Sequence, residues 1–202
     1  MARRMSSDDR RAALIQAAIQ VIARGGVAAA TTRAIVAEAK MPLGAFHYVF
    51  SSREELLSQV IRTVTDGERM AAELALPYMP GADIEQVIVA ALDAYLDLLV
   101  ADPNRELALF ELAFYGMRHD PALADRQYGF YYREAESMVE YVAERCGRVW
   151  TEPTAAIARR LVVAMDGLTS TWLADRDTPA ARDTIRSVAS WLAASTALQV
   201  PA

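Results

Sequence analysis

The sequence predicts an all-α fold of about nine helices, in which a three-helix head at the N-terminus precedes a larger helical body. Apolar residues recur at helical spacing along nearly the whole chain. No segment shows the alternation of apolar and polar residues, bounded by turn residues, that is typical of a half-buried strand. Several helix starts are marked by a capping side chain directly before a proline. With 202 residues, the chain is long enough to bury a sizeable core.

In the N-terminal part, helices are expected over about 8–24, 32–39, 43–49 and from about 53 into the seventies. The Gly25-Gly26 pair ends the first helix, because glycine tolerates the left-handed conformation of a C-cap. Ser52 and Glu55 have the S-x-x-E spacing of a capping box at the start of the fourth. That helix is expected to stop before Pro77. No proline interrupts it between head and body, so it connects the two mechanically.

The later helices are expected over about 83–101, 103–117, 121–146, 153–174 and 179–197. Three of them start at a capping side chain followed by proline, a pair found at Asp102-Pro103, Asp120-Pro121 and Thr178-Pro179. No strand and no internal repeat is expected. The predicted domains are a head over 1–60 and a body over 61–202.

The charge distribution indicates that the head binds a polyanion. The net charge is −5, but residues 1–60 carry eight basic and five acidic residues, a net of +3, and the remainder carries −8. Arg3 and Arg4 form either a flexible arm that reaches the minor groove of DNA or a solvated tail. The single cysteine, Cys146, excludes an internal disulfide, and no signal segment or long uncharged apolar run is present. These features predict a cytoplasmic protein that does not span a membrane.

The segment 31–50 has the pattern of a helix-turn-helix, in which the second of two short helices enters the major groove of DNA. Ile35 and Phe46 are placed to pack the pair against the first helix. On the other face, Gly44 and Ala45 are small enough to allow close approach to the floor of the groove.

Polar and basic side chains flank this face. His47 can hydrogen-bond a base edge or a phosphate, although a solvated surface histidine is the alternative for this residue. The Tyr48 hydroxyl can reach a phosphate, and Arg33, Lys40 and Arg53 can neutralise phosphates.

This region resembles the DNA-binding head of the tetracycline-repressor (TetR) family. The matching residues are Gly25-Gly26, Thr31-Thr32-Arg33, Ile35, Ala39, Gly44, Tyr48, Phe50 and Ser52-Arg53-Glu54-Glu55-Leu56. The resemblance covers about a quarter of the chain, and nine helices over about 200 residues are also similar to that family.

The resemblance implies a role for each matched position. Residues near the DNA backbone are Thr31 and Arg33, those facing base edges are Leu43, Gly44, Ala45 and His47, and those holding phosphates are Tyr48 and Arg53. Lys40 stands where the family often has the glycine of the turn, which predicts either a looser turn or a positive φ. Pro42 replaces the usual serine cap and removes one backbone donor.

The resemblance also implies a mostly apolar small-molecule cavity between the fourth and eighth helices, with a few polar anchors. The candidate lining residues are large aromatic and methionine side chains, namely Tyr95, Phe110, Phe114, Tyr131, Met138, Met165 and Trp172. Core packing is the alternative for each of them. No cofactor and no metal is expected.

The last two helices carry apolar residues off their main stripes, such as Val162 and Val163. A helix that is apolar on two sides must bury a second face, and two copies can do so as a four-helix bundle. The resemblance also implies a homodimer. The candidate interface residues are Leu161, Leu168, Val188, Trp191 and Leu192.

These observations predict a DNA-binding transcription regulator, a repressor that a small, largely apolar ligand releases from double-stranded operator DNA. An enzyme is not favoured, because the sequence has no H-E-x-x-H, no Gly-rich phosphate loop and no C-x-x-C. His47 and His119 have no metal-ligand spacing. An adaptor that does not bind DNA would leave the basic head unexplained.

Overall fold

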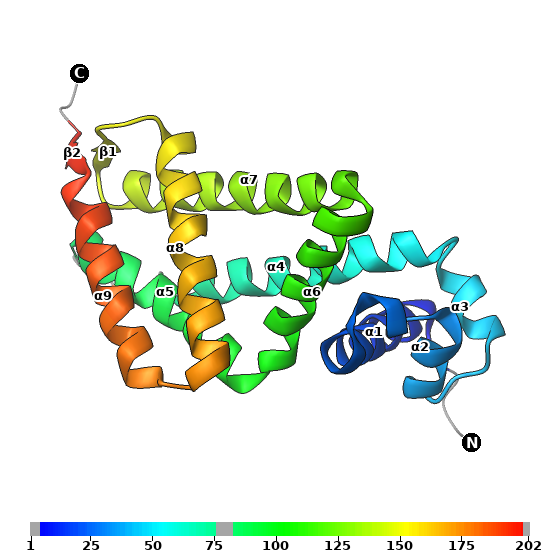
Figure 1. Cartoon of the computed structure of the whole chain (residues 1–202). Helices are drawn as coiled ribbons and strands as arrows, with labels where there is room; N and C mark the ends of the chain where they lie inside the picture. The colour runs from blue at the N-terminus through cyan, green and yellow to red at the C-terminus, as the bar shows by residue number, and fades with distance from the viewer. Residues whose placement is uncertain (1–4, 76–82, 200–202) are drawn as a thin grey trace. The chain divides into compact units, whose positions relative to one another are not determined.

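A computed structural model shows nine α-helices and one two-stranded sheet in the part of the chain that it describes, residues 5–75 and 83–199 (Figure 1). The helices are α1 (Ser7–Ala29), α2 (Thr32–Glu38), α3 (Gly44–Val49), α4 (Arg53–Ala75), α5 (Ile84–Ala101), α6 (Pro103–His119), α7 (Pro121–Arg145), α8 (Thr154–Asp175) and α9 (Thr178–Ala194). The all-α prediction and its order of helices are confirmed. Arg3, Arg4 and Pro77 lie outside the described residues.

The helix caps follow the sequence closely. The Thr31 hydroxyl accepts a hydrogen bond from the Ala34 amide at 3.2 Å, as expected for the N-cap of α2. At α9 the cap is Asp177 rather than Thr178, because its carboxylate accepts from the Ala180 amide at 3.0 Å. Gly26 has φ 73° and interrupts the helical geometry of α1, as expected for the glycine pair, but α1 continues to Ala29 instead of ending at the pair.

The expectation of no strand is wrong, and so is the expected end of the last helix at 197. Strand β1 (Arg148–Trp150) pairs antiparallel with β2 (Thr196–Leu198), and Val149 lies opposite Ala197. Gly147, at φ 61°, turns the chain out of α7 into β1. The pairing joins segments far apart in the chain, which a local pattern of apolar residues cannot indicate.

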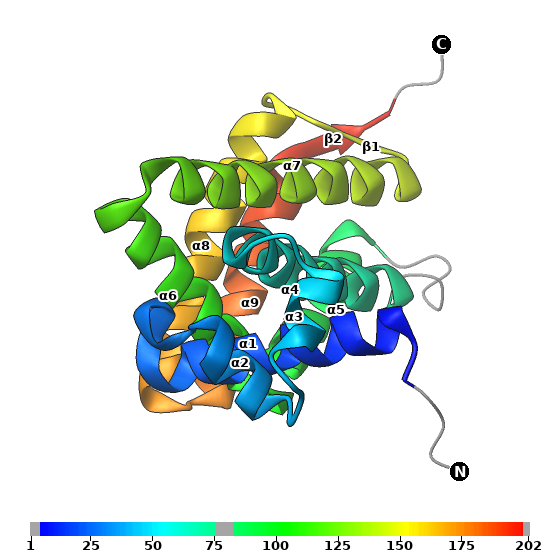
Figure 2. The same cartoon turned by 90° about the vertical axis from the view of Figure 1, so that its right-hand side faces the viewer.

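The described residues divide into two compact units. The first contains residues up to Asp66 together with Asn104–Gln127, so α6 belongs to it as well as α1, α2 and α3. In this unit the Asn104 amide donates to the Gln20 side chain at 2.8 Å. Figure 2 shows α1, α2 and α3 grouped together. Their fully buried side chains include Leu14, Ile22, Ile35, Phe46 and Phe50.

Helix α1 is the one described helix that has the length and apolar composition to cross a membrane. Leu14, Ala18 and Ile22 are fully buried in the first unit, and Gly26 breaks the regular helix before its end. The apolar face of α1 therefore forms the core of the head.

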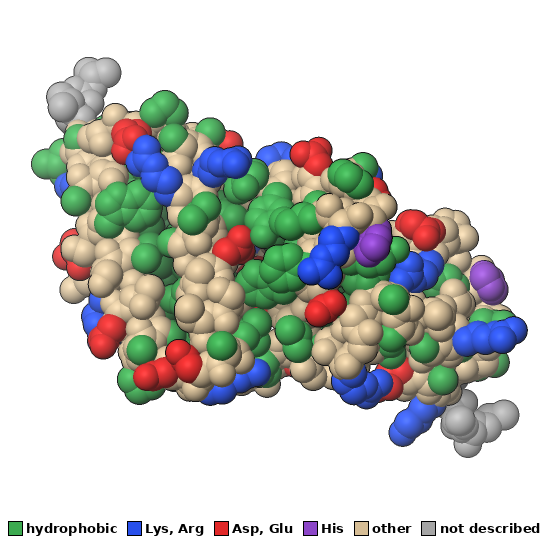
Figure 3. All heavy atoms as spheres, in the orientation of Figure 1, with side chains coloured by type: hydrophobic (Ala, Val, Ile, Leu, Met, Phe, Trp, Pro, Cys, Tyr) green, Lys and Arg blue, Asp and Glu red, His purple; other side chains and the backbone are tan. Residues whose placement is uncertain are grey.

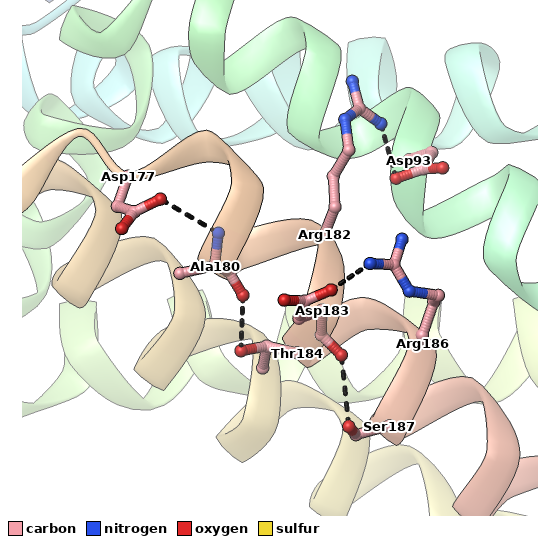
Figure 4. Close-up of polar contacts among 8 residues, drawn as sticks. All are labelled: Asp93, Asp177, Ala180, Arg182, Asp183, Thr184, Arg186 and Ser187. Atoms are coloured by element: carbon pink, nitrogen blue, oxygen red, sulfur yellow. Dashed lines mark hydrogen bonds and ion pairs between the residues drawn. The ribbon is translucent and has the colours of Figure 1, made fainter.

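The second unit contains Gly67–Pro103 and the chain from Tyr128 onward. Ile157 of α8 and Ile185 of α9 are fully buried there. Arg182 of α9 donates to Asp93 of α5 at 2.6 Å (Figure 4). It also donates to Asp97 of α5 at 2.7 Å, and so holds α9 against α5. Helices α4 and α7 each run without a break from one unit into the other, and the predicted boundary at residue 60 lies within α4.

Candidate functional site

A tight turn joins α2 to α3. The Lys40 amide donates to the Ala37 carbonyl at 3.0 Å, and the Met41 amide donates to the Val36 carbonyl at 2.8 Å. Lys40 has φ 55°, so the positive φ expected at this position is confirmed. One residue in the left-handed conformation reverses the chain between the two helices.

Helix α3 has one buried face and one open face. Phe46 is buried and its ring centroid lies 5.6 Å from that of buried Phe50. On the opposite side Leu43 is 44% exposed and Tyr48 is 71% exposed. A Cβ built at Gly44 would meet no atom within 4 Å. The open face can therefore approach a large partner without rearrangement of the helix.

The nine predicted DNA-contacting residues all lie in the first unit. Seven of them are exposed, namely Thr31, Arg33, Lys40, Leu43, Gly44, His47 and Tyr48. Ala45 is half-buried beside Phe46, and Arg53 is also half-buried.

Arg53 is engaged inside the head. Its Nε donates to the Ala30 carbonyl at 2.7 Å, and its Nη2 donates to the Val27 carbonyl. These carbonyls lie at the C-terminal end of α1, where the Val27 carbonyl also accepts from the Ala30 amide at 3.1 Å. Arg53 therefore ties the start of α4 to the end of α1, an arrangement that the sequence analysis, which placed Arg53 on phosphate, did not predict.

Two arginines of α1 support the end of α3, and the sequence analysis missed both. The Arg10 guanidinium lies 5.0 Å from the Tyr48 ring centroid, which adds a positive charge beside the open face. Arg11 donates to the Val49 carbonyl at 3.0 Å and lies 4.5 Å from the Phe50 ring centroid. The sequence shows only that these two residues are basic. Their contacts depend on how α1 packs against α3, which the sequence pattern does not indicate.

The predicted ligand-lining residues fall in both units. Phe110 and Phe114 lie on α6 in the first unit, with stacked rings whose centroids are 6.1 Å apart, and Phe114 is half exposed. The other five lie in the second unit. There the Tyr95 hydroxyl is 2.5 Å from Oγ1 of buried Thr169.

The remaining candidates in the second unit differ in burial. Trp172 is 5% exposed and its indole N–H donates to Thr178 at 3.0 Å, so this ring is part of the core. Met138 and Met165 are partly buried at the edges of the two core clusters of the second unit. Tyr131 is half-buried, in edge-to-face contact with another tyrosine of α7.

The predicted interface residues also differ. Leu168 and Leu192 are 4% and 1% exposed, so they are buried by their own chain, whereas Leu161, Val188 and Trp191 are half-buried. Figure 3 shows that uncharged surface covers most of α8. Val163, an apolar residue of that helix, is 64% exposed.

An exposed short helix, held against two others and edged by arginines, defines a helix-turn-helix DNA-binding protein. Residues 14–60 match the model of the family described as "Bacterial regulatory proteins, tetR family". The HTH-type nicotine-responsive transcriptional repressor HdnoR of Paenarthrobacter nicotinovorans is 30% identical over 182 residues, which are 89% of this chain and 92% of that protein. The chain belongs to the tetR family and is a DNA-binding transcription regulator.

Solved structures agree with this fold. A transcriptional regulator from Rhodococcus sp. Rha1 has a TM-score of 0.72 at 19% identity, over 95% of this chain and 99% of that one. The multidrug binding protein EbrR, complexed with imidazole, has a TM-score of 0.58 at 27% identity, over 96% of this chain and 97% of that one.

Proposed function

We propose that this chain is a cytoplasmic homodimeric repressor whose α3 enters the major groove of operator DNA and whose body binds a small, largely apolar effector. DNA binding is assigned to 1–60, and effector binding and dimerisation to 61–202. The observation that carries the proposal is the open face of α3, on which Leu43, His47 and Tyr48 are exposed around a glycine with free space. Small and polar groups on an exposed helix suit a groove lined by base edges.

The second copy is expected to pack on the outer face of α8 and α9. Val163 is exposed and a Cβ at Gly167 would meet no atom within 4 Å, so another helix can approach closely here. Leu161, Val188 and Trp191 would border this contact. Leu168 and Leu192 would support it from within the chain.

The relatives support a small effector. HdnoR is named for its response to nicotine, and EbrR is named as a multidrug binding protein and was crystallised with imidazole. Both compounds are small nitrogen-containing rings. Release from DNA requires that the effector bind the state unable to hold DNA more tightly than the competent state.

The proposal is tested by footprinting the wild-type protein on DNA upstream of its own gene. A two-fold dimer is expected to protect a pseudo-palindrome whose half-sites lie about 34–36 Å apart, or a multiple of that distance. The affinity is expected to fall steeply with salt, because phosphate contacts release counterions. Absence of protection at low salt, with a protein that light scattering finds dimeric, would contradict the operator assignment.

A further inference from the structure

Asp166 of α8 is a half-buried carboxylate that contacts α7. Its Oδ2 accepts a hydrogen bond from the Tyr128 hydroxyl at 3.0 Å. Burial raises the pKa of Asp166, and the hydrogen bond from Tyr128 lowers it by less. The carboxylate is therefore shielded from water without enough local compensation for its charge.

Among the described residues, 5–75 and 83–199, Asp166 has no basic side chain as an ion-pair partner. Two other partly shielded acids of the same unit do have one: Asp93 pairs with Arg182 at 2.6 Å, and Glu134 pairs with Arg69 at 3.4 Å. A positive charge brought to Asp166 would offset the free-energy cost of burying its carboxylate charge.

Tyr128, which contacts this carboxylate, belongs to a group of three tyrosine rings on α7. The Tyr128 ring centroid lies 5.5 Å from that of Tyr131 and 6.0 Å from that of Tyr132. Positions three and four residues apart on α7 share one face of the helix, so the three rings form one patch. The Arg159 guanidinium already lies 4.8 Å from the Tyr132 ring centroid, so a ring of this patch accepts a cation in the protein itself.

Tyr128 links the carboxylate to the rings. Burial, and next the negative charge of Asp166, raise the pKa of Tyr128, so its hydroxyl keeps its proton and donates to Asp166. Within the described residues this hydrogen bond engages Oδ2, so Oδ1 is the oxygen that a ligand would meet, next to an aromatic face that attracts positive charge.

We propose that Asp166, together with the faces of Tyr128 and Tyr131, binds the ammonium group of a small organic amine. Because this inference rests on the proposed function, the amine is the charged end of the effector, and its apolar part contacts the neighbouring body side chains. An arginine from the second copy is the competing occupant of the same position.

The test uses benzyltrimethylammonium, a permanent cation, and its uncharged carbon isostere neopentylbenzene. Binding to the full-length dimer is followed by chemical shifts of isotope-labelled tyrosine. Wild type is expected to bind the cation at least about tenfold more tightly than the isostere, since a desolvated cation gains from both the carboxylate and the rings. Asp166→Asn, which is isosteric and can still accept from Tyr128, is expected to lose about tenfold in affinity for the cation.

Two matched controls distinguish the effects of the carboxylate charge and of the aromatic ring from a general disruption of the structure. Asp175→Asn, an exposed acid of the same helix, is expected to bind the cation like wild type. Tyr131→Phe is expected to retain binding, whereas Tyr131→Leu is expected to weaken it about fivefold, because only leucine removes the aromatic face. Equal binding of the cation and the isostere, or unchanged binding in Asp166→Asn, would overturn the proposal.

Operator binding and light scattering on the same samples keep this inference distinct from the proposed function. Asp166→Asn without a probe is expected to remain dimeric and to bind operator like wild type. If Asp166→Asn becomes monomeric, the second copy occupies the carboxylate and the amine site is overturned. If wild type fails to bind operator, the proposed function is what fails.

Discussion

At the scale of single residues, Arg53 makes contacts within the head that its charge alone does not indicate. Two carbonyls at the end of α1 occupy its guanidinium, so its contribution to DNA binding is expected to pass through the position of α4. Arg33 is exposed on α2, and its charge faces solvent. We therefore expect Arg53 to act by positioning α4 and Arg33 to neutralise a phosphate.

Arg53→Ala is therefore predicted to lower the free energy of unfolding by about 1–2 kcal/mol, because two carbonyls lose a charged donor. The salt dependence of operator binding is expected to stay near that of wild type. Arg33→Ala, the matched control, is expected to leave stability unchanged and to reduce the salt slope by about one. Denaturant unfolding and salt titrations measure both quantities. A reduced slope with unchanged stability in Arg53→Ala would place this side chain on phosphate instead.

Glu55 gives the head a pH dependence. The Ser51 amide donates to its carboxylate at 2.9 Å and the Ser51 hydroxyl at 2.7 Å, and Arg11 pairs with it at 3.1 Å. These contacts, in that order, hold the pKa of Glu55 below its ordinary value. A depressed folded-state pKa stabilises the protein above the unfolded-state pKa of about 4.3, and that contribution is lost as pH falls through the folded value.

Glu55→Gln is accordingly predicted to be less stable than wild type at pH 7, with a difference that shrinks toward pH 3. Urea unfolding across this range measures it. Glu54→Gln changes an exposed neighbour on the same helix and serves as the control. A difference between Glu55→Gln and wild type that does not vary with pH would show that the carboxylate charge is not responsible.

At the scale of elements, the turn between α2 and α3 carries backbone strain at Lys40, which has φ 55°. A side chain in the left-handed region costs about 1–2 kcal/mol, and glycine avoids most of that cost but loses more entropy on folding. Lys40→Gly is predicted to stabilise the head by about 0.5–1 kcal/mol, which corresponds to a rise in Tm of about 1–4 °C. A calorimetric Tm below that of wild type would contradict this account of the turn.

Local patterns were sufficient for the helices and insufficient for two kinds of feature. Thr31 caps the start of α2 and Gly26 breaks the regular geometry of α1 through their own chemistry, so both could be predicted from the sequence. The β1–β2 pair could not, because Val149 and Ala197 are far apart in the sequence and their pairing leaves no local pattern.

The candidate sites follow the same rule. The open face of α3 was predictable because all its residues come from one short segment. The bonds of Arg53 with α1 were not, because they join positions 23 and 26 residues apart. In the sequence Asp166 looks like any surface acid. Only its hydrogen bond with Tyr128, seen in the structure, makes it a candidate ligand-binding residue.

At the scale of the whole molecule, α4 is the continuous connection by which the effector is proposed to control DNA binding. The first unit ends at Asp66 and the second begins at Gly67, within this helix. Inserting Gly-Gly after Asp66 is predicted to keep effector binding and to abolish effector-driven release. The coupling free energy between effector binding and operator binding, about 1–3 kcal/mol, would then be lost. Operator affinity with and without an effector that releases wild type measures the coupling. Full release in the insertion variant would mean that the signal takes another route.

The account depends most on the claim that α3 lies in the major groove. Gly44 is the sharpest probe, because a side chain there has free space in the protein and would meet DNA in the complex. Gly44→Ala tests the added Cβ alone, and Ser137→Glu adds the same charge at an exposed position of α7. All variants are first compared with wild type by circular dichroism and thermal unfolding.

The decisive measurement is operator affinity by fluorescence anisotropy for wild type, Gly44→Glu and Ser137→Glu. Gly44→Glu is predicted to keep wild-type folding and dimerisation but to lose roughly a hundredfold or more in affinity, because its carboxylate would meet base edges and phosphates at close range. Ser137→Glu is predicted to bind like wild type. Normal operator binding by a folded Gly44→Glu protein would show that α3 does not occupy the groove and would contradict the account.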